Sequence, residues 1–139
     1  MKVFLDTNII LDFLDLKRPT HQEAEKIVQF LVVNNIDVFL SEDMLTTIYY
    51  ISKNKTQVLD FFTTVSRLWN VVSFGQTIIH EAIKVCQQNN TIDFEDTLQC
   101  LCAKANECTL LITNDKAFYR CGIDVVTSNE FLASLNSKK

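Results

Sequence analysis

The amino-acid sequence predicts an α/β protein, in which a parallel sheet of four or five strands is covered by helices on both faces. Short apolar runs of three to five residues alternate along the chain with longer amphipathic segments of helical periodicity. This alternation is typical of right-handed β–α–β units, which build a three-layer sandwich. The 139 residues include only 2 Gly and 1 Pro, so we expect one domain over residues 1–139 without a flexible linker.

The first half of the chain predicts two buried strands and three helices. The expected segments are a strand over residues 2–5, a helix directly after it, a helix over residues 21–33, a strand over residues 36–40 and a helix through residue 51. Pro19 marks the break between the first two helices, because proline interrupts a helix. Ser41 is expected to be the N-cap of the third helix, since its hydroxyl can accept a hydrogen bond from a free backbone N–H.

The second half of the chain continues the alternation. The expected segments are helices over residues 55–67, 76–88 and 93–106, strands over residues 69–74, 110–113 and 124–126, and a last helix from residue 128. Apolar residues recur on one side of these helices, which indicates that they pack on a sheet. Side chains that follow the carboxyl ends of parallel strands meet in one crevice, and we therefore expect a functional site there.

Acidic residues occupy these positions. Asp6 follows the first strand and is followed by a helix that also carries Asp12, while Asp115 follows the strand over residues 110–113. Asp93 and Asp96 are three residues apart and therefore share a helix face. Carboxylates grouped without His or Cys are the ligands that Mg²⁺ or Mn²⁺ prefers, and such a site is typical of phosphodiester hydrolysis by metal-activated water.

Three motifs resemble the landmarks of the PIN domain, the fold of the VapC toxins of bacterial toxin–antitoxin pairs. They are D-T-N-I-I-L-D from residue 6, D-F-E-D-T-L-Q-C-L-C-A-K-A from residue 93 and L-L-I-T-N-D-K-A-F from residue 110. They come in the family's order over nearly the whole chain. The resemblance implies a PIN-like sandwich with strand order near 3-2-1-4-5 and the activity of a metal-dependent ribonuclease, the toxin of such a pair.

The resemblance also implies roles for single residues. Asp6, Asp96 and Asp115 match the acids that hold Mg²⁺ or Mn²⁺ and serve catalysis, and Asp93 is a further candidate metal ligand. Thr7, Asn8 and Thr113 match the small polar residues that support the first acid. RNA would then be cut by a metal-activated water, without a covalent enzyme intermediate.

One position departs from the family pattern. The family usually has a Glu six residues past a Ser, and counting from Ser41 leads to Thr47, which carries no charge. Asp43, one helical turn earlier on the same face, can replace the missing acid, and so can Asp93. The remaining alternative is a weakened site.

Each predicted site acid also has a purely structural explanation. Asp6 and Asp93 can act as helix N-caps, Asp96 can complement the helix dipole in the first turn, and Asp115 can be a turn residue. The sequence patterns alone leave these alternatives open.

Two other functions compete with the ribonuclease. One is a PIN scaffold that binds RNA or a protein without cutting, which is suggested by Thr47 and by the net charge of −4 with no Lys/Arg-rich run. The other is a phosphotransfer domain of the receiver or phosphatase kind. That class has a D-x-D pair after its first strand, whereas this chain has D-T-N, and we therefore rank it below the others.

The composition and the family resemblance also predict location, cysteine state and partners. No apolar run reaches the roughly 18 residues that a membrane span needs, and no signal-peptide pattern precedes the first strand, so we expect a cytoplasmic protein without membrane contact. The 5 cysteines form no C-x-x-C pair and are expected to be reduced core thiols. RNA, a small antitoxin protein and a second copy of the chain in a homodimer are the expected partners.

Overall fold

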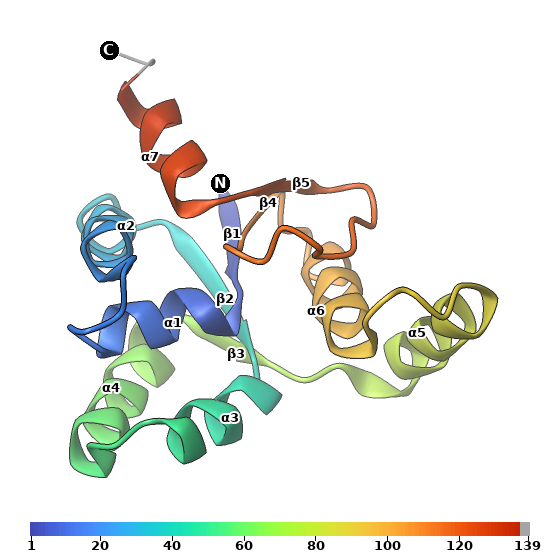
Figure 1. Ribbon diagram of the computed structural model, residues 1–139, viewed down its shortest axis with the longest axis horizontal. Coiled ribbons are helices and arrows are strands. Elements are labelled where there is room, and N and C mark those ends of the chain that lie inside the picture. Colours follow the sequence, from blue (N-terminus) through green and yellow to red (C-terminus); the bar gives the residue numbers. More distant parts are fainter. Residues whose placement is uncertain (137–139) are drawn as a thin grey trace.

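The computed structural model describes residues 1–136, and in this part of the chain five strands form one parallel sheet. The spatial order is β3-β2-β1-β4-β5 (Figure 1). The strands are β1 (Lys2–Leu5), β2 (Asp37–Ser41), β3 (Asn70–Val72), β4 (Leu110–Ile112) and β5 (Asp124–Val126). The predicted parallel sheet and its order are confirmed. Residues 137–139 of the predicted single domain lie outside the described residues.

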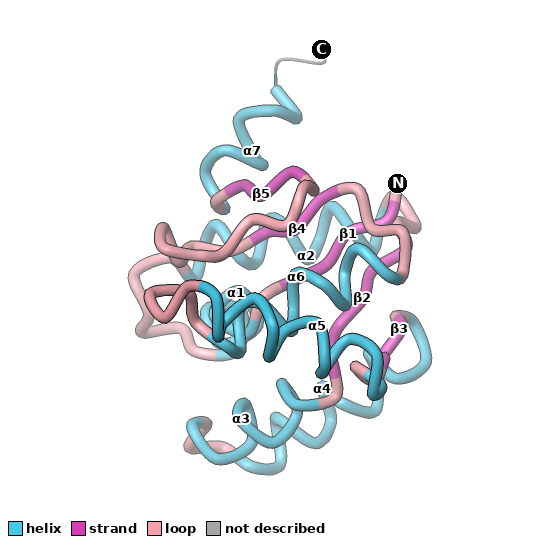
Figure 2. Tube along the Cα trace, turned by 90° about the vertical axis from the view of Figure 1, so that its right-hand side faces the viewer, coloured by secondary structure: helices cyan, strands magenta, loops and turns pink. Residues whose placement is uncertain are grey.

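Helices cover both faces of the sheet. They are α1 (Thr7–Leu14), α2 (His21–Val33), α3 (Asp43–Ile51), α4 (Lys55–Leu68), α5 (Gly75–Gln88), α6 (Phe94–Ala105) and α7 (Ser128–Asn136). Helices α1 and α2 lie on one side of the strands and α5 and α6 on the other (Figure 1), while Figure 2 is viewed from the side of α5 and α6. None of the helices in residues 1–136 combines the length and apolar character that crossing a membrane requires.

Strand β1 is central in the sheet, and its register determines what lies at the carboxyl edge. Phe4 pairs with Phe39 of β2, and Leu5 pairs with Ile112 of β4. One residue further along, Asp6 therefore lies between Ser41 and Thr113. The backbone N–H of Asp6 still donates to the carbonyl of Ile112, at 3.0 Å. This register brings the first and third motifs side by side.

The strands form the core because their side chains are apolar on both faces, as expected for a covered parallel sheet. Leu111 in β4 is completely buried, whereas its neighbour Leu110 is only half-buried. We expect Leu111→Ala to lower the free energy of unfolding by about 2–5 kcal/mol, because the substitution leaves a cavity in the core. Leu110→Ala is the matched control and should cost clearly less. Urea denaturation measures both, and equal losses would contradict this account of the core.

The prediction that Ser41 caps α3 is wrong. Ser41 is the last residue of β2, where it pairs with Val72 of β3, and α3 begins two residues later at Asp43. The Ser41 hydroxyl lies 2.5 Å from Oδ1 of Asp43 and donates to it. The pairing with β3, which no local pattern reveals, extends the strand through Ser41.

The prediction of five reduced cysteines is wrong for two of them. Cys100 of α6 and Cys121 form a disulfide, with their Cα atoms 6.0 Å apart. The loop between β4 and β5 folds back onto α6, and a separation of 21 residues in the sequence does not indicate this contact.

The other three cysteines are free thiols, as predicted. Burial raises the pKa of Cys102 to about 12 and that of Cys108 to about 11, so both stay protonated at neutral pH.

Candidate metal centre

Asp6 lies at the carboxyl end of the central strand and is almost completely buried, with 5% of its surface exposed. It is the N-cap residue of α1, and its Oδ1 accepts a hydrogen bond from the Thr7 backbone N–H at 2.7 Å. Its Oδ2 accepts from the Thr113 hydroxyl at 2.7 Å and from the Asn8 side-chain amide at 2.9 Å. The capping explanation is therefore correct, but it uses only one of the two carboxylate oxygens.

Asn8 joins the first motif to the third. Its amide nitrogen also donates to the Thr113 hydroxyl oxygen at 3.0 Å, and its amide oxygen accepts from the Asn114 backbone N–H at 3.0 Å. The Thr113 oxygen in turn accepts from the Asp115 backbone N–H at 3.1 Å. Asp6 and Asp115 are therefore held by one connected hydrogen-bond network, and the supporting positions of Asn8 and Thr113 agree with the prediction.

Asp96 in the first turn of α6 approaches this network from the other face of the sheet. Its exposed fraction is 8%, and its pKa is raised from 3.8 to about 7. The largest cause is burial, followed by the charges of Asp93, Asp6 and Asp115 and by a hydrogen bond with the Asp115 carboxyl group. Burial and the Asp115 charge also raise the pKa of Asp6, against the opposing effect of its hydrogen bonds. The structure thus brings Asp6, Asp96 and Asp115 together.

Asp93 has the structural role that the sequence left open. It is the N-cap residue of α6, and its Oδ2 accepts from the Asp96 backbone N–H at 2.9 Å. Its charge also raises the pKa of Asp96. A contact with a metal ion stays a prediction for this residue.

Glu95 is a site residue that the sequence analysis missed. Burial raises its pKa, and so do the charges of Asp43, Asp6 and Asp93, in that order. Glu95 directly precedes Asp96, and neighbouring helical residues point about 100° apart, so the helix pattern alone assigns Glu95 to another face. Asp43 at the start of α3 lies close enough to Glu95 to raise its pKa, so the face of α6 that carries Glu95 also belongs to the acidic site.

The position that departs from the family pattern supplies no charge. Thr47 is half-buried, and its hydroxyl donates to the Asp43 carbonyl oxygen of its own helix at 3.3 Å. Asp43 is thus the acid of α3 that acts electrostatically on the site, through Glu95.

The donor set fits a hard divalent cation in its chemistry. The side chains of Asp6, Asp96 and Asp115 offer carboxylate oxygens, which are the ligands that Mg²⁺ and Mn²⁺ prefer. The buried Thr7 hydroxyl, next to Asp6, has no hydrogen-bond partner among the described residues. In the observed side-chain conformations, no group of three Asp, Glu, His or Cys residues within 1–136 is arranged to hold one metal ion. Because the pKa of Asp96 is raised to about 7, a proton competes with a cation for this carboxylate.

One hollow lies beside the network, and a second lies at the other end of α1. The first, of about 220 Å³, is lined by Thr113 and Asp115 together with the cationic side chains of Lys116 and Arg120. It places positive charge directly beside the acids.

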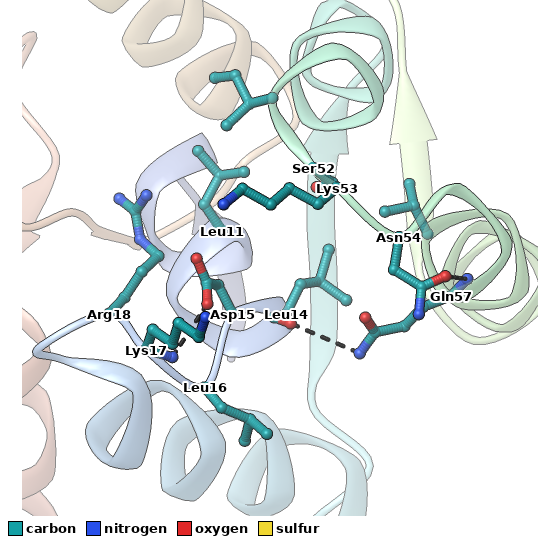
Figure 3. Close-up of a pocket in the computed structure, with 12 residues that line it drawn as sticks. Leu11, Leu14, Asp15, Leu16, Lys17, Arg18, Ser52, Lys53, Asn54 and Gln57 are labelled. Atoms are coloured by element: carbon teal, nitrogen blue, oxygen red, sulfur yellow. Dashed lines mark hydrogen bonds between the residues drawn. The ribbon is translucent and has the colours of Figure 1, made fainter.

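The second hollow, of about 310 Å³, lies between the end of α1 and the connection from α3 to α4. Figure 3 shows Lys53 extending from this connection toward Leu11. Lys17 and Arg18 also line this hollow, whereas none of the predicted site acids does.

Comparison with known proteins agrees with this geometry. Residues 2–117 match the family described as PIN domain. The chain is 36% identical over 139 residues to "Ribonuclease VapC1" of Aquifex aeolicus (strain VF5), covering 98% of this chain and 96% of that protein.

Solved structures share the fold. A toxin–antitoxin complex from Klebsiella pneumoniae contains a chain with a TM-score of 0.67 at 24% identity, covering 91% of this chain and 97% of that one. VapBC2 from Rickettsia felis, bound to a promoter DNA fragment, gives a TM-score of 0.69 at 20% identity, covering 91% and 98%.

Proposed function

The chain belongs to the PIN domain family, and from this we propose that it is an endoribonuclease in which Asp6, Asp96 and Asp115 hold Mg²⁺ or Mn²⁺. One observation carries the proposal: acids from three distant segments interact at one edge of the sheet, where burial and then the charges of the neighbouring acids raise the pKa of Asp96 to about 7. Asp93 is proposed as a further ligand. The name of the Aquifex aeolicus relative supports RNA as the substrate.

The side chains of this protein orient the site. When bound, the cation lowers the pKa of a water molecule and offsets negative charge on the phosphodiester. The hydrogen bonds from Thr7, Asn8 and Thr113 hold Asp6 in a fixed orientation, which reduces the reorganisation needed at the site. We propose that Lys116 and Arg120, which line the hollow next to Asp115, contact the phosphate chain of the RNA.

We further propose a small antitoxin protein as the partner that controls this activity, as the toxin–antitoxin complexes among the structural neighbours suggest.

Exposed apolar side chains on α3 and α4 offer a surface for a homodimer; they include Tyr50, Ile51 and Leu59. Burial of such side chains is the main driving force of protein association. RNA as the substrate is consistent with the predicted cytoplasmic location.

The test of the proposed function is cleavage of one structured and one unstructured RNA by the purified protein, with Mn²⁺, with Mg²⁺ and with EDTA. We expect cleavage with either metal ion and none with EDTA. A folded protein that binds neither ion and cuts neither RNA would contradict the proposal. That result would favour the PIN scaffold that binds without cutting.

Asp43 is proposed to replace the acid that is absent at Thr47. We expect Asp43→Asn to weaken Mn²⁺ binding about tenfold, because it removes a charge that reaches the site through Glu95. Thr47→Glu should change the Mn²⁺ affinity less than about threefold, since the charge is already present. Isothermal titration with Mn²⁺ measures both variants. A large gain from Thr47→Glu together with no loss from Asp43→Asn would show that the site is weakened instead.

A further inference from the structure

Asp12 is a buried acid that the proposed metal site does not use. It lies in α1, six residues after Asp6, and its exposed fraction is 3%. Its Oδ1 accepts from Arg18 Nε at 2.7 Å, and its Oδ2 accepts from the Thr20 hydroxyl at 2.5 Å. These two partners belong to the connection between α1 and α2 and form a local network.

One contact of Asp12 reaches far beyond this connection. Its Oδ2 also accepts from the side-chain amide of Asn114, at 3.3 Å, across 102 positions of the sequence. The same amide nitrogen donates to the Ser128 hydroxyl at 3.0 Å, and the amide oxygen accepts from the Ser128 backbone N–H at 2.9 Å. The Asn114 side chain is therefore held between the end of α1 and the start of α7.

Asn114 is placed between two acids of the candidate site. Its backbone N–H donates to the side chain of Asn8, which in turn donates to Asp6. The next residue in the chain is Asp115. A rotation of the Asn114 backbone would thus break the bond to Asn8 and redirect Asp115.

We propose that Asp12 is a positioning residue, which fixes, through Asn114, the backbone that carries Asp115. The inference rests on the proposed function, because it assigns Asp12 a part in the same site. Arg18 is the outer end of this chain of contacts. Its side chain is 35% exposed and points toward α1 (Figure 3), so its charge keeps the buried Asp12 carboxylate paired while it remains in contact with water.

Asp12→Asn disconnects Asn114 with almost no change of shape. An amide has only one acceptor oxygen. The positive charge of Arg18 favours the orientation in which this oxygen faces Arg18. The new NH₂ group then faces the NH₂ group of Asn114, where neither can accept. The matched control is Asp15→Asn, which removes the same charge at the end of the same helix, where the Asp15 side chain accepts only a local bond from the Lys17 backbone N–H among the described residues.

The first measurement is amide hydrogen exchange of Asn114 by NMR, in the metal-free protein. We expect Asp12→Asn to accelerate exchange at least about tenfold, because the bond to Asn8 opens more often. Asp15→Asn should leave the exchange rate unchanged.

The second measurement is RNA cleavage with Mn²⁺. Asp12→Asn should lower kcat about 10–100-fold with little change in KM, a typical cost of losing an outer contact of a metal site.

A double variant distinguishes positioning from general loss of stability. If Asp12 acts through Asn114, Asp12→Asn added to Asn114→Ala should lower kcat little further, whereas independent effects would multiply. Equal exchange rates and equal kcat in Asp12→Asn and Asp15→Asn would overturn the inference. If the wild type cuts no RNA, the proposed function fails, and the exchange measurement still decides whether Asp12 holds Asn114.

Discussion

Asp96→Asn should abolish RNA cleavage and at the same time stabilise the metal-free protein. We expect the cleavage rate to fall at least about 10³-fold, because the variant loses a charged ligand of the metal ion that stabilises the negative charge of the transition state. The melting temperature in EDTA at about pH 8 should rise by a few degrees. In the wild type, burial and three neighbouring acids oppose the charge of Asp96, and the amide carries no such cost.

Asp60→Asn is the control for this prediction. Asp60 is an exposed acid of α4, and its loss should leave both the rate and the melting temperature nearly unchanged. RNA cleavage assays and calorimetry in EDTA measure the two effects. If Asp96→Asn cut RNA at the wild-type rate, Asp96 would have only its role in the first turn of α6.

The stability of the metal-free protein should fall as the pH rises from about 5 to about 8. The folded-state pKa of Asp96 is about 7, well above its ordinary value of 3.8, so the folded protein holds this proton more tightly than the unfolded chain does. The resulting stabilisation is complete below about pH 4 and is lost as the pH rises through about 7. Solvent screening reduces it, and we expect about 1–2 kcal/mol, or about 5 °C in melting temperature.

A divalent cation should reverse this trend. Mn²⁺ binds the ionised acids, so it competes with the proton of Asp96 and should stabilise the protein more at about pH 8 than at about pH 5.5. At about 100 times its Kd, Mn²⁺ adds about 2.7 kcal/mol to the free energy of unfolding. Thermal unfolding at both pH values, with Mn²⁺ and with EDTA, measures the effect. An equal increase at both pH values would mean that Mn²⁺ does not compete with this proton.

The sheet could be predicted from the sequence because its strands are short, apolar and separated by helices. The strand order came from the family resemblance rather than from periodicity, and the pairing of β1 with β4 confirms it. Ser41 was misassigned because its conformation depends on pairing with β3, which lies about 30 residues further along the chain. The disulfide between Cys100 and Cys121 was missed for a similar reason, since it depends on how one loop packs on α6.

Asp6, Asp96 and Asp115 could be proposed as site acids because each lies in one of the three motifs, just after a predicted strand or in the first turn of a predicted helix. Glu95 and Asp12 could not be assigned in this way. The surroundings of Glu95 depend on the approach of Asp43 from another helix, and the partner of Asp12 outside its own segment lies 102 residues away. Contacts between distant segments decided both cases, and local residue patterns do not encode them.

The most direct test of the central claim is a titration of the metal-free protein with Mn²⁺ at about pH 8, in which EPR measures the free ion. If acids from three distant segments form one cation site, the wild type binds at least one Mn²⁺ per chain, Mg²⁺ displaces it, and Asp96→Asn and Asp115→Asn lose it. A wild-type protein that circular dichroism shows to be folded, yet leaves all the Mn²⁺ free, would contradict the claim.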